Sequence, residues 1–392
     1  MQRLLLALCT LFALYACAPT LPHRTGEEKL AEPVSEIQIP APEPVIPETI
    51  EPIIVDKERA IPHIALLLPL RSPIFGTSAS AVESGFMAAA RHDGQVLPIQ
   101  AYDNFDENNS VVSVYRQAVE NGALAVVGPL TRNGVTALAE SHNTPVPTLS
   151  LNVVDTIPAQ NLYYFGMAIE SEARQIARLA RQHGLHQSII ITTREQLSKR
   201  LQAAFEDEWN ASGGTILREI EFVDNSSIFA DITEIPGTMI FIATDAKKAR
   251  LIRPYLSNRL PEYATSRVFL GNTDTLLNYD LSGIRFVDMP WLLQPDHPAV
   301  MIYPRPGKPL SVDNDRLYAL GIDAYRLIRL MLFNRLNASL PLDGVSGQIR
   351  LNGHVFQRSS VPSVFMQGQA QVAGAPVMPA IQMFPEQPVG NP

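Results

Sequence analysis

The sequence has little cysteine. Its 392 residues include two, Cys9 and Cys17, both near the N-terminus. Cys9 falls within an apolar run, Leu4–Ala16, that follows Arg3. At 13 residues this run is shorter than the roughly 20 that cross a bilayer, so it predicts a signal peptide over residues 1–16 rather than an anchoring helix. Removal of that peptide would leave Cys17 without a disulfide partner.

The four residues that end at Cys17, Leu-Tyr-Ala-Cys, resemble a bacterial lipobox, in which a small residue precedes the cysteine that is lipidated and becomes N-terminal. Plain secretion with an incidental cysteine is the alternative. An acylated Cys17 accounts better than a free thiol for a single cysteine in an exported chain. Ala18 stands where an aspartate would signal retention at the inner membrane, so we expect an outer-membrane anchor that faces the periplasm.

Positive charge is also scarce. The chain has 31 Lys and Arg against 39 Asp and Glu, a net charge of −8, which becomes −8 − 1 = −9 once the signal peptide with Arg3 is removed. Nucleic-acid binding needs a basic face that displaces counterions from phosphates, so we exclude that class of function. The hydrophobic fraction of 46% is typical of a globular protein, and the length suffices for two ordinary domains.

Catalytic and metal-binding motifs are absent. The sequence has no G-x-S-x-G, H-E-x-x-H, P-loop or G-x-G-x-x-G pattern. The acidic stretch Asp103–Asn108 lacks one ligand and the glycine that a calcium loop needs. His183 and His186 lie on either side of a predicted helix end, which would not hold both on one ion. The sequence therefore predicts no enzyme, no metal and no cofactor.

Proline is concentrated before the folded region. Residues 17–61, a lipidated cysteine followed by closely spaced prolines, read as a tether. A Pro-rich chain favours extended polyproline II at ~3.1 Å per residue, so these residues would reach at most about 140 Å from the membrane. At the other end, residues 370–392 are rich in Gln, Pro and Gly without periodicity, which predicts a disordered tail.

Between these segments, apolar strands alternate with amphipathic helices. The stretch Ile64–Asp103 predicts a strand, a loop, a helix and a second strand, which is a βαβ unit. The alternation continues to Met167, restarts near Glu170, and is followed by a long helix over 313–336 and short strands with Gly turns. The fold class is therefore α/β, with two doubly wound, Rossmann-like lobes and a hinge of crossing segments. We expect lobe 1 to comprise 62–167 plus 293–340, and lobe 2 to comprise 168–292 plus 341–369.

Two local predictions concern the second lobe. Thr193 and Gln196 have the spacing of a capping box, which predicts that a helix begins with Thr193 as its N-cap. The run Arg267–Asn272 predicts the last strand of the series.

Six segments carry a resemblance to a known family. In chain order, behind the lipobox, they are IALLLPL, VVGPL, PTLSLN, GIRFVDMPWLL, LYALGIDAYRL and LDGVSGQIRLN. Together they resemble the LppC family of outer-membrane lipoproteins, the penicillin-binding protein activators, whose carboxyl-terminal domain has the type I periplasmic-binding-protein fold. The resemblance covers about residues 61–369. Larger members carry a helical-repeat domain before this one, and here only the Pro-rich tether occupies that place.

Loops that follow the strands of such a fold face each other across the hinge. The candidate cleft-lining residues of the first lobe carry hydroxyls or lie at helix N-termini, which suit a carboxylate or a sugar. Alternatively, Ser78, Thr131 and Asn152 only cap helices and satisfy turns. The full candidate set is Thr77, Ser78, Thr131, Arg132, Ser150 and Asn152.

Two functions remain open. The resemblance implies a tethered regulator that reaches a class A penicillin-binding protein, a peptidoglycan synthase, and stimulates it without chemistry of its own. The alternative is a solute-binding protein that delivers an amino acid or similar small ligand to a transporter. Such a receptor would be free or attached at the inner membrane, whereas Cys17-Ala18 indicates the outer membrane.

Overall fold

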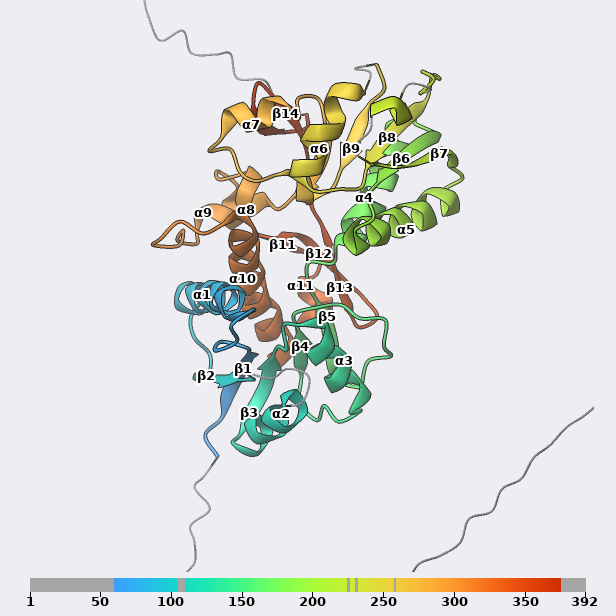
Figure 1. The fold of residues 1–392 in the computed structure, drawn as a ribbon. Helices are drawn as coiled ribbons and strands as arrows, with labels where there is room; N and C mark the ends of the chain where they lie inside the picture. The colour runs from blue at the N-terminus through green and yellow to red at the C-terminus, as the bar shows by residue number, and fades with distance from the viewer. Residues whose placement is uncertain (1–59, 105–109, 224–225, 230–231, 257–258, 375–392) are drawn as a thin grey trace, which may run out of the picture. The chain divides into compact units, whose positions relative to one another are not determined.

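A computed structural model describes residues 60–104, 110–223, 226–229, 232–256 and 259–374 (Figure 1). The predicted signal peptide, Cys17 and nearly all of the predicted tether lie outside these residues. So do most of the acidic stretch Asp103–Asn108 and the chain after 374.

The first lobe is built on an eight-stranded sheet. Its first strand, β1 (His63–Leu68), is buried at all six positions, as expected for a sheet covered on both faces. The five N-terminal strands pair in parallel, and a later antiparallel group extends the sheet beside β5. The order across the sheet is β11 (Leu342–Gly344), β12 (Gly347–Asn352), β13 (Val355–Ser359), β5 (Leu162–Phe165), β4 (Thr148–Ser150), β3 (Ala123–Val127), β1 and β2 (Ile99–Asp103).

Helices cover both faces of this sheet. On one face, α1 (Gly76–Asp93) and α10 (Val312–Leu332) share a core with Phe86 and Tyr325, whose rings meet edge to face at 5.2 Å. On the other face, α2 (Val111–Glu120) and α3 (Arg132–Glu140) contribute Tyr115 and Leu138 to a second core. Figure 1 shows α1 alongside α10 in this lobe.

Two glycines allow α1 and α10 to touch. A Cβ on Gly85 would lie 1.9 Å from the carbonyl oxygen of Tyr318, and one on Gly321 would lie 2.1 Å from that of Val82. Real Cβ atoms do not approach backbone that closely, so each helix needs glycine at the crossing.

We expect Gly85→Ala to lower the free energy of unfolding by about 2–3 kcal/mol, because the helices must separate and the overpacking outweighs the better helix propensity of alanine. Chemical denaturation of the purified chain measures it. The control is Gly307→Ala, where a Cβ meets nothing within 4 Å. Equal stability of the two variants would contradict this account of the crossing.

The second lobe is built on a seven-stranded sheet. Helices α4 (Ile169–Gln182) and α5 (Gln196–Ala211) pack on one face, and α6 (Ala246–Ile252) packs on the other with the 3-10 turn η3 (Ser266–Val268). The order across the sheet is β15 (Gln369–Val372), β14 (Val361–Met366), β10 (Arg285–Asp288), β9 (Glu262–Ala264), β8 (Thr238–Ile242), β6 (Gln187–Thr192) and β7 (Thr215–Glu221). The five strands from β10 onward in this order pair in parallel. Strand β14 pairs antiparallel with β10, and β15 pairs antiparallel with β14.

The chain passes between the two sheets three times: after β5, after β10 and after β13. The second passage contains α8 (Pro290–Leu293) and α9 (Pro298–Met301), and short elements complete the fold: η1 (Ser226–Phe229), η2 (Arg253–Tyr255), α7 (Thr275–Tyr279) and α11 (Leu336–Ser339). This architecture confirms the predicted fold class of two doubly wound α/β lobes with crossing segments.

The lobe boundaries need a correction. Residues 341–369 were expected in lobe 2, but β11, β12 and β13 belong to the first sheet, and only β14 and β15 join the second. Hairpins with Gly turns do not reveal which sheet edge they join, and here the pairing of Val355 with Tyr164 decides it. The predicted tail also began too early, because β15 extends to Val372.

Two local predictions in the second lobe are wrong. Helix α5 has Glu195 as its N-cap, with no side-chain capping bond, and not Thr193. The Thr193 N–H instead donates to Ser198 Oγ at 2.8 Å, and Ser198 Oγ donates to the Ala243 carbonyl, which holds this segment against β8. The predicted strand Arg267–Asn272 contains the end of η3, and the strand lies earlier, at β9.

Candidate functional site

Three of the predicted cleft residues serve local structure. The Thr131 hydroxyl caps α3 by accepting from the Gly134 N–H at 3.2 Å. Ser150 is buried and donates to the carbonyl oxygens of Asn152 and Tyr163, both at 3.1 Å. The Asn152 amide donates to the Leu130 carbonyl at 3.0 Å. These bonds gather the three residues where β3 and β4 end, and they are the contacts that the helix-capping interpretation expects. Ligand binding by them remains a prediction.

Thr77 and Ser78 lie in the first turn of α1, which begins at Gly76, and not in the loop before it. Their place at the cleft remains a prediction. Thr77 is exposed and lines a groove between α1 and residues 304–310.

Arg132 faces charged groups of the second lobe. Its Nη1 lies 3.8 Å from Oε1 of Glu170, near the start of α4. The same oxygen accepts from Arg200 Nε of α5 at 2.7 Å. Arg132 of the first lobe is thus linked to the second lobe through the Glu170 carboxylate. Sequence reasoning missed Glu170 and Arg200, because each partner is 30 or more residues from the other in the chain.

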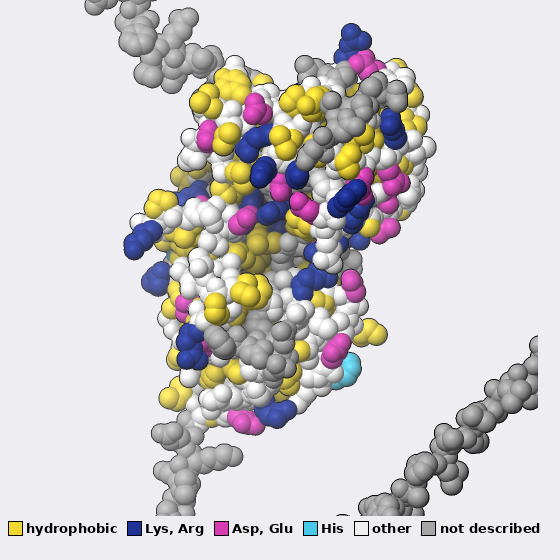
Figure 2. Space-filling model, viewed as in Figure 1, with side chains coloured by type: hydrophobic (Ala, Val, Ile, Leu, Met, Phe, Trp, Pro, Cys, Tyr) yellow, Lys and Arg dark blue, Asp and Glu magenta, His cyan; other side chains and the backbone are white. Residues whose placement is uncertain are grey.

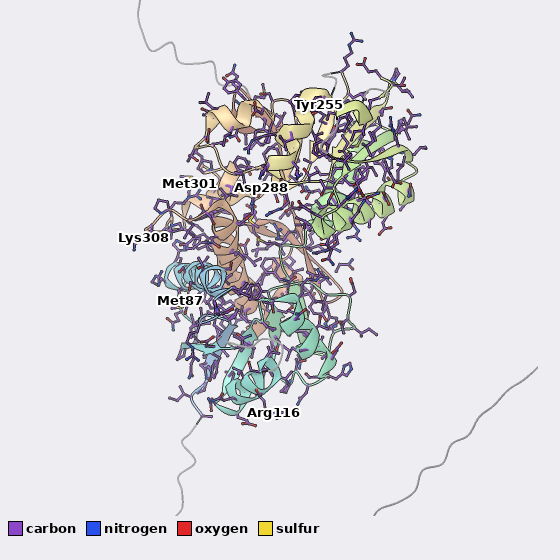
Figure 3. All side chains as sticks on the ribbon, in the orientation of Figure 1. Met87, Arg116, Tyr255, Asp288, Met301 and Lys308 are labelled. Carbon is purple, nitrogen blue, oxygen red and sulfur yellow. The ribbon has the colours of Figure 1, made fainter. Side chains whose placement is uncertain are left out.

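The larger polar site at the lobe junction has four charged residues, called here the hinge cluster: Glu172, Asp288, Arg316 and Arg358. Arg316 of α10 is 5% exposed and Asp288, at the end of β10, is 1% exposed. The guanidinium donates from Nε and Nη2 to the two Asp288 oxygens, at 3.1 and 2.7 Å. Figure 3 labels Asp288 near the junction of the lobes. The first lobe's long helix is therefore bound to the second lobe's sheet.

The other pair repeats this arrangement. Nη2 of Arg358, on β13 of the first sheet, lies 4.0 Å from Oε1 of Glu172, on α4 of the second lobe. Arg358 also donates to the carbonyls of Gly166 and Ser346, and Glu172 accepts from the Ser266 N–H at 3.0 Å. Each of the two arginines of the first lobe thus faces one carboxylate of the second.

Burial sets the electrostatics of the cluster. Burial, and then the nearby charge of Asp288, raise the pKa of Glu172. Burial also lowers the pKa of Arg358, and Glu172 partly offsets this. For Arg316 burial opposes the charge, but Asp288 outweighs it and raises the pKa above its ordinary value. Mutual pairing therefore keeps these charges in the interior, and loss of one partner would leave a buried charge uncompensated.

Asp323 ties α10 to the turn between β11 and β12. It is fully buried, and its carboxylate accepts from the N–H groups of Val345 and Ser346 at 3.2 and 2.7 Å and from the Ser346 hydroxyl at 2.6 Å. Asp288, Asp323 and this turn come from three of the motif segments of the sequence. The fold thus brings these motifs together at the lobe junction.

The residues that the structure describes contain no group of three or more His, Cys, Asp or Glu placed to hold a metal ion. His183 and His186, which the sequence places on either side of a helix end, have separate partners. His183 Nδ1 lies 2.7 Å from the Tyr263 hydroxyl, and His186 contacts Arg181. Within the same ranges, no helix combines the length and the apolarity that crossing a membrane requires.

Comparison with protein families gives a match over most of the chain. Residues 38–237 and 231–359 match the family described as "LppC putative lipoprotein". The penicillin-binding protein activator LpoA of Pantoea ananatis is 26% identical over 359 residues, covering 76% of this chain and 52% of that protein. LpoA of Photobacterium profundum is 24% identical, covering 82% and 58%. The chain spans about half the length of these curated relatives.

Two kinds of solved structure share the fold. One is described as a putative branched-chain amino acid ABC transporter from Chromobacterium violaceum; it is 36% identical with a TM-score of 0.68, covering 78% of this chain and 99% of that one. The other, the C-domain of LpoA from Haemophilus influenzae, is 23% identical with a TM-score of 0.67, covering 79% and 99%. The predicted type I periplasmic-binding-protein fold is thereby confirmed, and the family match, which extends across both lobes, shows that the chain belongs to the LppC family.

Proposed function

We propose that this protein is an outer-membrane lipoprotein, facing the periplasm, that binds a class A penicillin-binding protein and stimulates its synthesis of peptidoglycan, without catalysis of its own. The observation that carries the proposal is the family match over both lobes. The curated relatives that it resembles are named penicillin-binding protein activators. The chain spans about half of the length of these relatives. Its partner and its activity are therefore part of the proposal.

The hinge cluster supports a regulator of fixed shape. Binding proteins of this fold take up solutes by hinge closure, which needs a junction that rearranges at low cost. Here two buried ion pairs join the lobes, and Arg316 also donates to the carbonyls of Ser266 and Phe269, at 3.0 and 2.9 Å. Opening the junction would expose or separate these charges. Such a junction suits a protein that presents constant surfaces to a partner.

The partner is tested by capture from envelope extracts. The full chain, carrying an affinity tag, is expected to retain a class A penicillin-binding protein after crosslinking, identified by mass spectrometry and by labelling with a fluorescent β-lactam. Capture of permease subunits in place of a synthase would contradict the proposal.

The second candidate function, a receptor for an amino acid, is favoured by the 36% identity to the Chromobacterium violaceum protein. A ligand that binds only the folded state raises its melting temperature in a concentration-dependent way. The candidate predicts such a rise with branched-chain amino acids at millimolar concentration. Melting curves that do not move with any of the twenty amino acids would remove it.

The anchor is tested at Cys17. We expect Cys17→Ser to move the protein from the outer membrane to the soluble periplasmic fraction, because a serine cannot receive the thioether-linked lipid. Fractionation of the cell envelope with immunodetection measures this. The control is Cys9→Ser, in the predicted signal peptide, which should leave the mature protein in the membrane. If Cys17→Ser still sedimented with outer membranes, the anchor would be wrong.

A further inference from the structure

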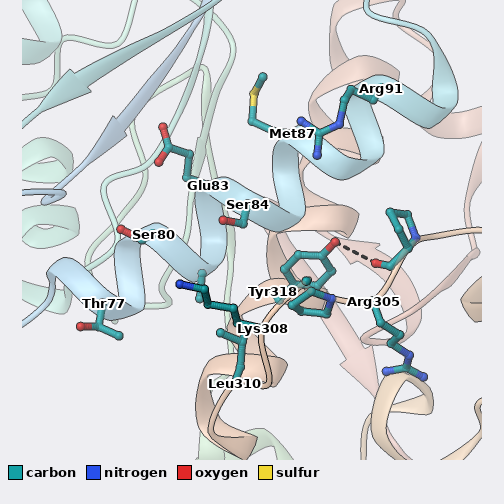
Figure 4. A pocket seen from close by; sticks show the side chains of 14 residues that line it. Thr77, Ser80, Glu83, Ser84, Met87, Arg91, Arg305, Lys308, Leu310 and Tyr318 are labelled. Atoms are coloured by element: carbon teal, nitrogen blue, oxygen red, sulfur yellow. Dashed lines mark hydrogen bonds between the residues drawn. The ribbon is translucent and has the colours of Figure 1, made fainter.

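A groove runs along the outer face of α1 (Figure 4). It has a volume of about 660 Å³, and its other wall is the loop over residues 304–310 with Tyr318 of α10. The opposite face of α1 is buried in the core. Five groove residues of the helix are spaced by three or four positions, so they form one continuous stripe. They are Thr77, Ser80, Ser84, Met87 and Arg91.

The groove carries more positive than negative charge. Arg91, Arg305 and Lys308 line it with a single acid, Glu83, although the chain as a whole has a net charge of −8. Among the described residues, neither Arg91 nor Lys308 has a carboxylate within ion-pair distance. Figure 4 shows the Lys308 side chain beside the part of the stripe between Ser80 and Ser84, and Arg91 at the end of the stripe farthest from Thr77. In Figure 3 Lys308 and Met87 lie at one edge of the molecule, along which Figure 2 shows Lys and Arg side chains.

The helix contributes hydroxyls to the same groove. Thr77, Ser80 and Ser84 are exposed, and within the described part of the chain their side chains make no hydrogen bond. Ser80 and Ser84 lie in the exposed interior of α1, where glutamate or lysine would stabilise the helix more than serine does. Three free hydroxyls in a row suit the carbonyl and amide groups of an extended chain.

The loop wall is held in place before anything binds. Tyr318 donates to the Pro304 carbonyl at 2.8 Å, which is the dashed line in Figure 4. The Arg305 guanidinium lies 3.8 Å from the centre of the Trp291 ring and donates to the Trp291 carbonyl at 2.8 Å. Pro304, Pro306 and Pro309 restrict the backbone further. A preformed groove avoids part of the ordering cost of binding.

The length of the groove sets the size of its occupant. Thr77 and Arg91 are 14 positions apart, which at ~1.5 Å per residue is about 21 Å along the helix. An extended peptide rises about 3.3 Å per residue, so about six residues fill this length. Arg91 lies at one end of the stripe and Lys308 in the half that holds Thr77 and Ser80. Acidic side chains near the two ends of such a segment would therefore each have a cation on their own half of the groove.

We propose that the groove between α1 and residues 304–310 binds an extended segment of about six residues, with an acidic side chain near each end, from the partner protein. The identity of that partner rests on the proposed function, whereas peptide binding by the groove does not.

The test uses the full chain and a fluorescein-labelled hexapeptide with Glu at positions 1 and 6, Ala and Pro between, and its counterpart with Gln at both ends. Fluorescence anisotropy at low salt should show saturable binding of the Glu peptide, at least about tenfold tighter than the Gln peptide. The variant Arg91→Glu/Lys308→Glu should weaken binding about tenfold, because both attractions become repulsions.

The matched control is Arg116→Glu/Lys247→Glu, which reverses the same amount of charge at two exposed positions outside the groove. It should bind the peptide like the unaltered chain, and both double variants should melt at the same temperature. Absence of saturable binding, equal affinity for the Gln peptide, or equal weakening by both double variants would overturn the proposal. If the chain binds the peptide but captures no synthase, only the proposed function is contradicted. If the chain captures a synthase but does not bind the peptide, only the proposal for the groove is contradicted.

Discussion

Replacing Arg316 by methionine is expected to lower the free energy of unfolding by about 3–5 kcal/mol. The change leaves Asp288, which is 1% exposed, as a buried carboxylate without its bidentate partner. It also removes the donors to the carbonyls of Ser266 and Phe269. Denaturant unfolding followed by tryptophan fluorescence measures the loss, because Trp209 and Trp291 report on opposite lobes.

Two further variants separate the buried pair from general effects on α10. Asp313, whose side chain is 58% exposed, also accepts a hydrogen bond from Arg316. Water screens this pair, so Asp313→Ala should lower the free energy of unfolding by at most about 1 kcal/mol. The double variant Arg316→Met/Asp288→Asn should regain part of the loss, since neither position then carries a buried charge without its partner, and the Asn oxygen can still accept from the Met289 N–H. A double variant less stable than Arg316→Met would contradict the role assigned to the pair.

The stability of the chain is expected to fall between about pH 4.5 and pH 7. Glu262 on β9 is 3% exposed, and its burial raises the pKa to about 7 from 4.5, although the Arg253 Nε atom lies 2.8 Å away. In that pH window the folded chain holds a proton that the unfolded chain has released. Raising the pH therefore favours unfolding, and the effect levels off above pH 7. The difference between the two pKa values of Glu262, 4.5 and about 7, corresponds to a loss of about 3 kcal/mol in the free energy of unfolding over this window.

The measurement is the free energy of unfolding of Glu262→Gln and of the unaltered chain at pH 5 and at pH 8. The glutamine does not titrate, so the variant should lose much less stability between the two pH values. A smaller fall should persist, because burial also raises the pKa of Glu172. The exposed Glu140 supplies the control, Glu140→Gln, which should keep the full dependence. Identical pH dependence in all three proteins would rule out Glu262 as the cause.

Much of the fold was predictable because apolar runs and helical stripes are local signals. The run Ile64–Leu68 lies wholly in β1, and the long stripe after residue 312 is α10. The sheet that receives β11–β13 was not predictable, since strand pairing joins residues almost two hundred positions apart, such as Tyr164 and Val355. The capping box failed for a similar reason, because a contact with Ala243 holds Ser198 in place.

The hinge cluster was missed because each charged residue, taken alone, resembles a surface residue. A signal was nevertheless present in α10, where Arg316 and Asp323 fall on one helical face with the apolar Leu320 between them. A charge within a buried stripe requires a buried partner. Asp288 gives a similar signal, because it directly follows the apolar pair Phe286 and Val287 on β10. The partners themselves could not be paired from the sequence.

The proposed function requires that the purified chain activates a peptidoglycan synthase in solution. The most direct measurement adds the purified chain to a purified class A penicillin-binding protein with lipid-linked precursor, and follows the rate of glycan polymerisation and the fraction of cross-linked peptides. Both should rise with the concentration of the chain and saturate, and the chain alone should produce neither product. Unchanged polymerisation and cross-linking at saturating concentrations, by a chain shown to be folded, would contradict it.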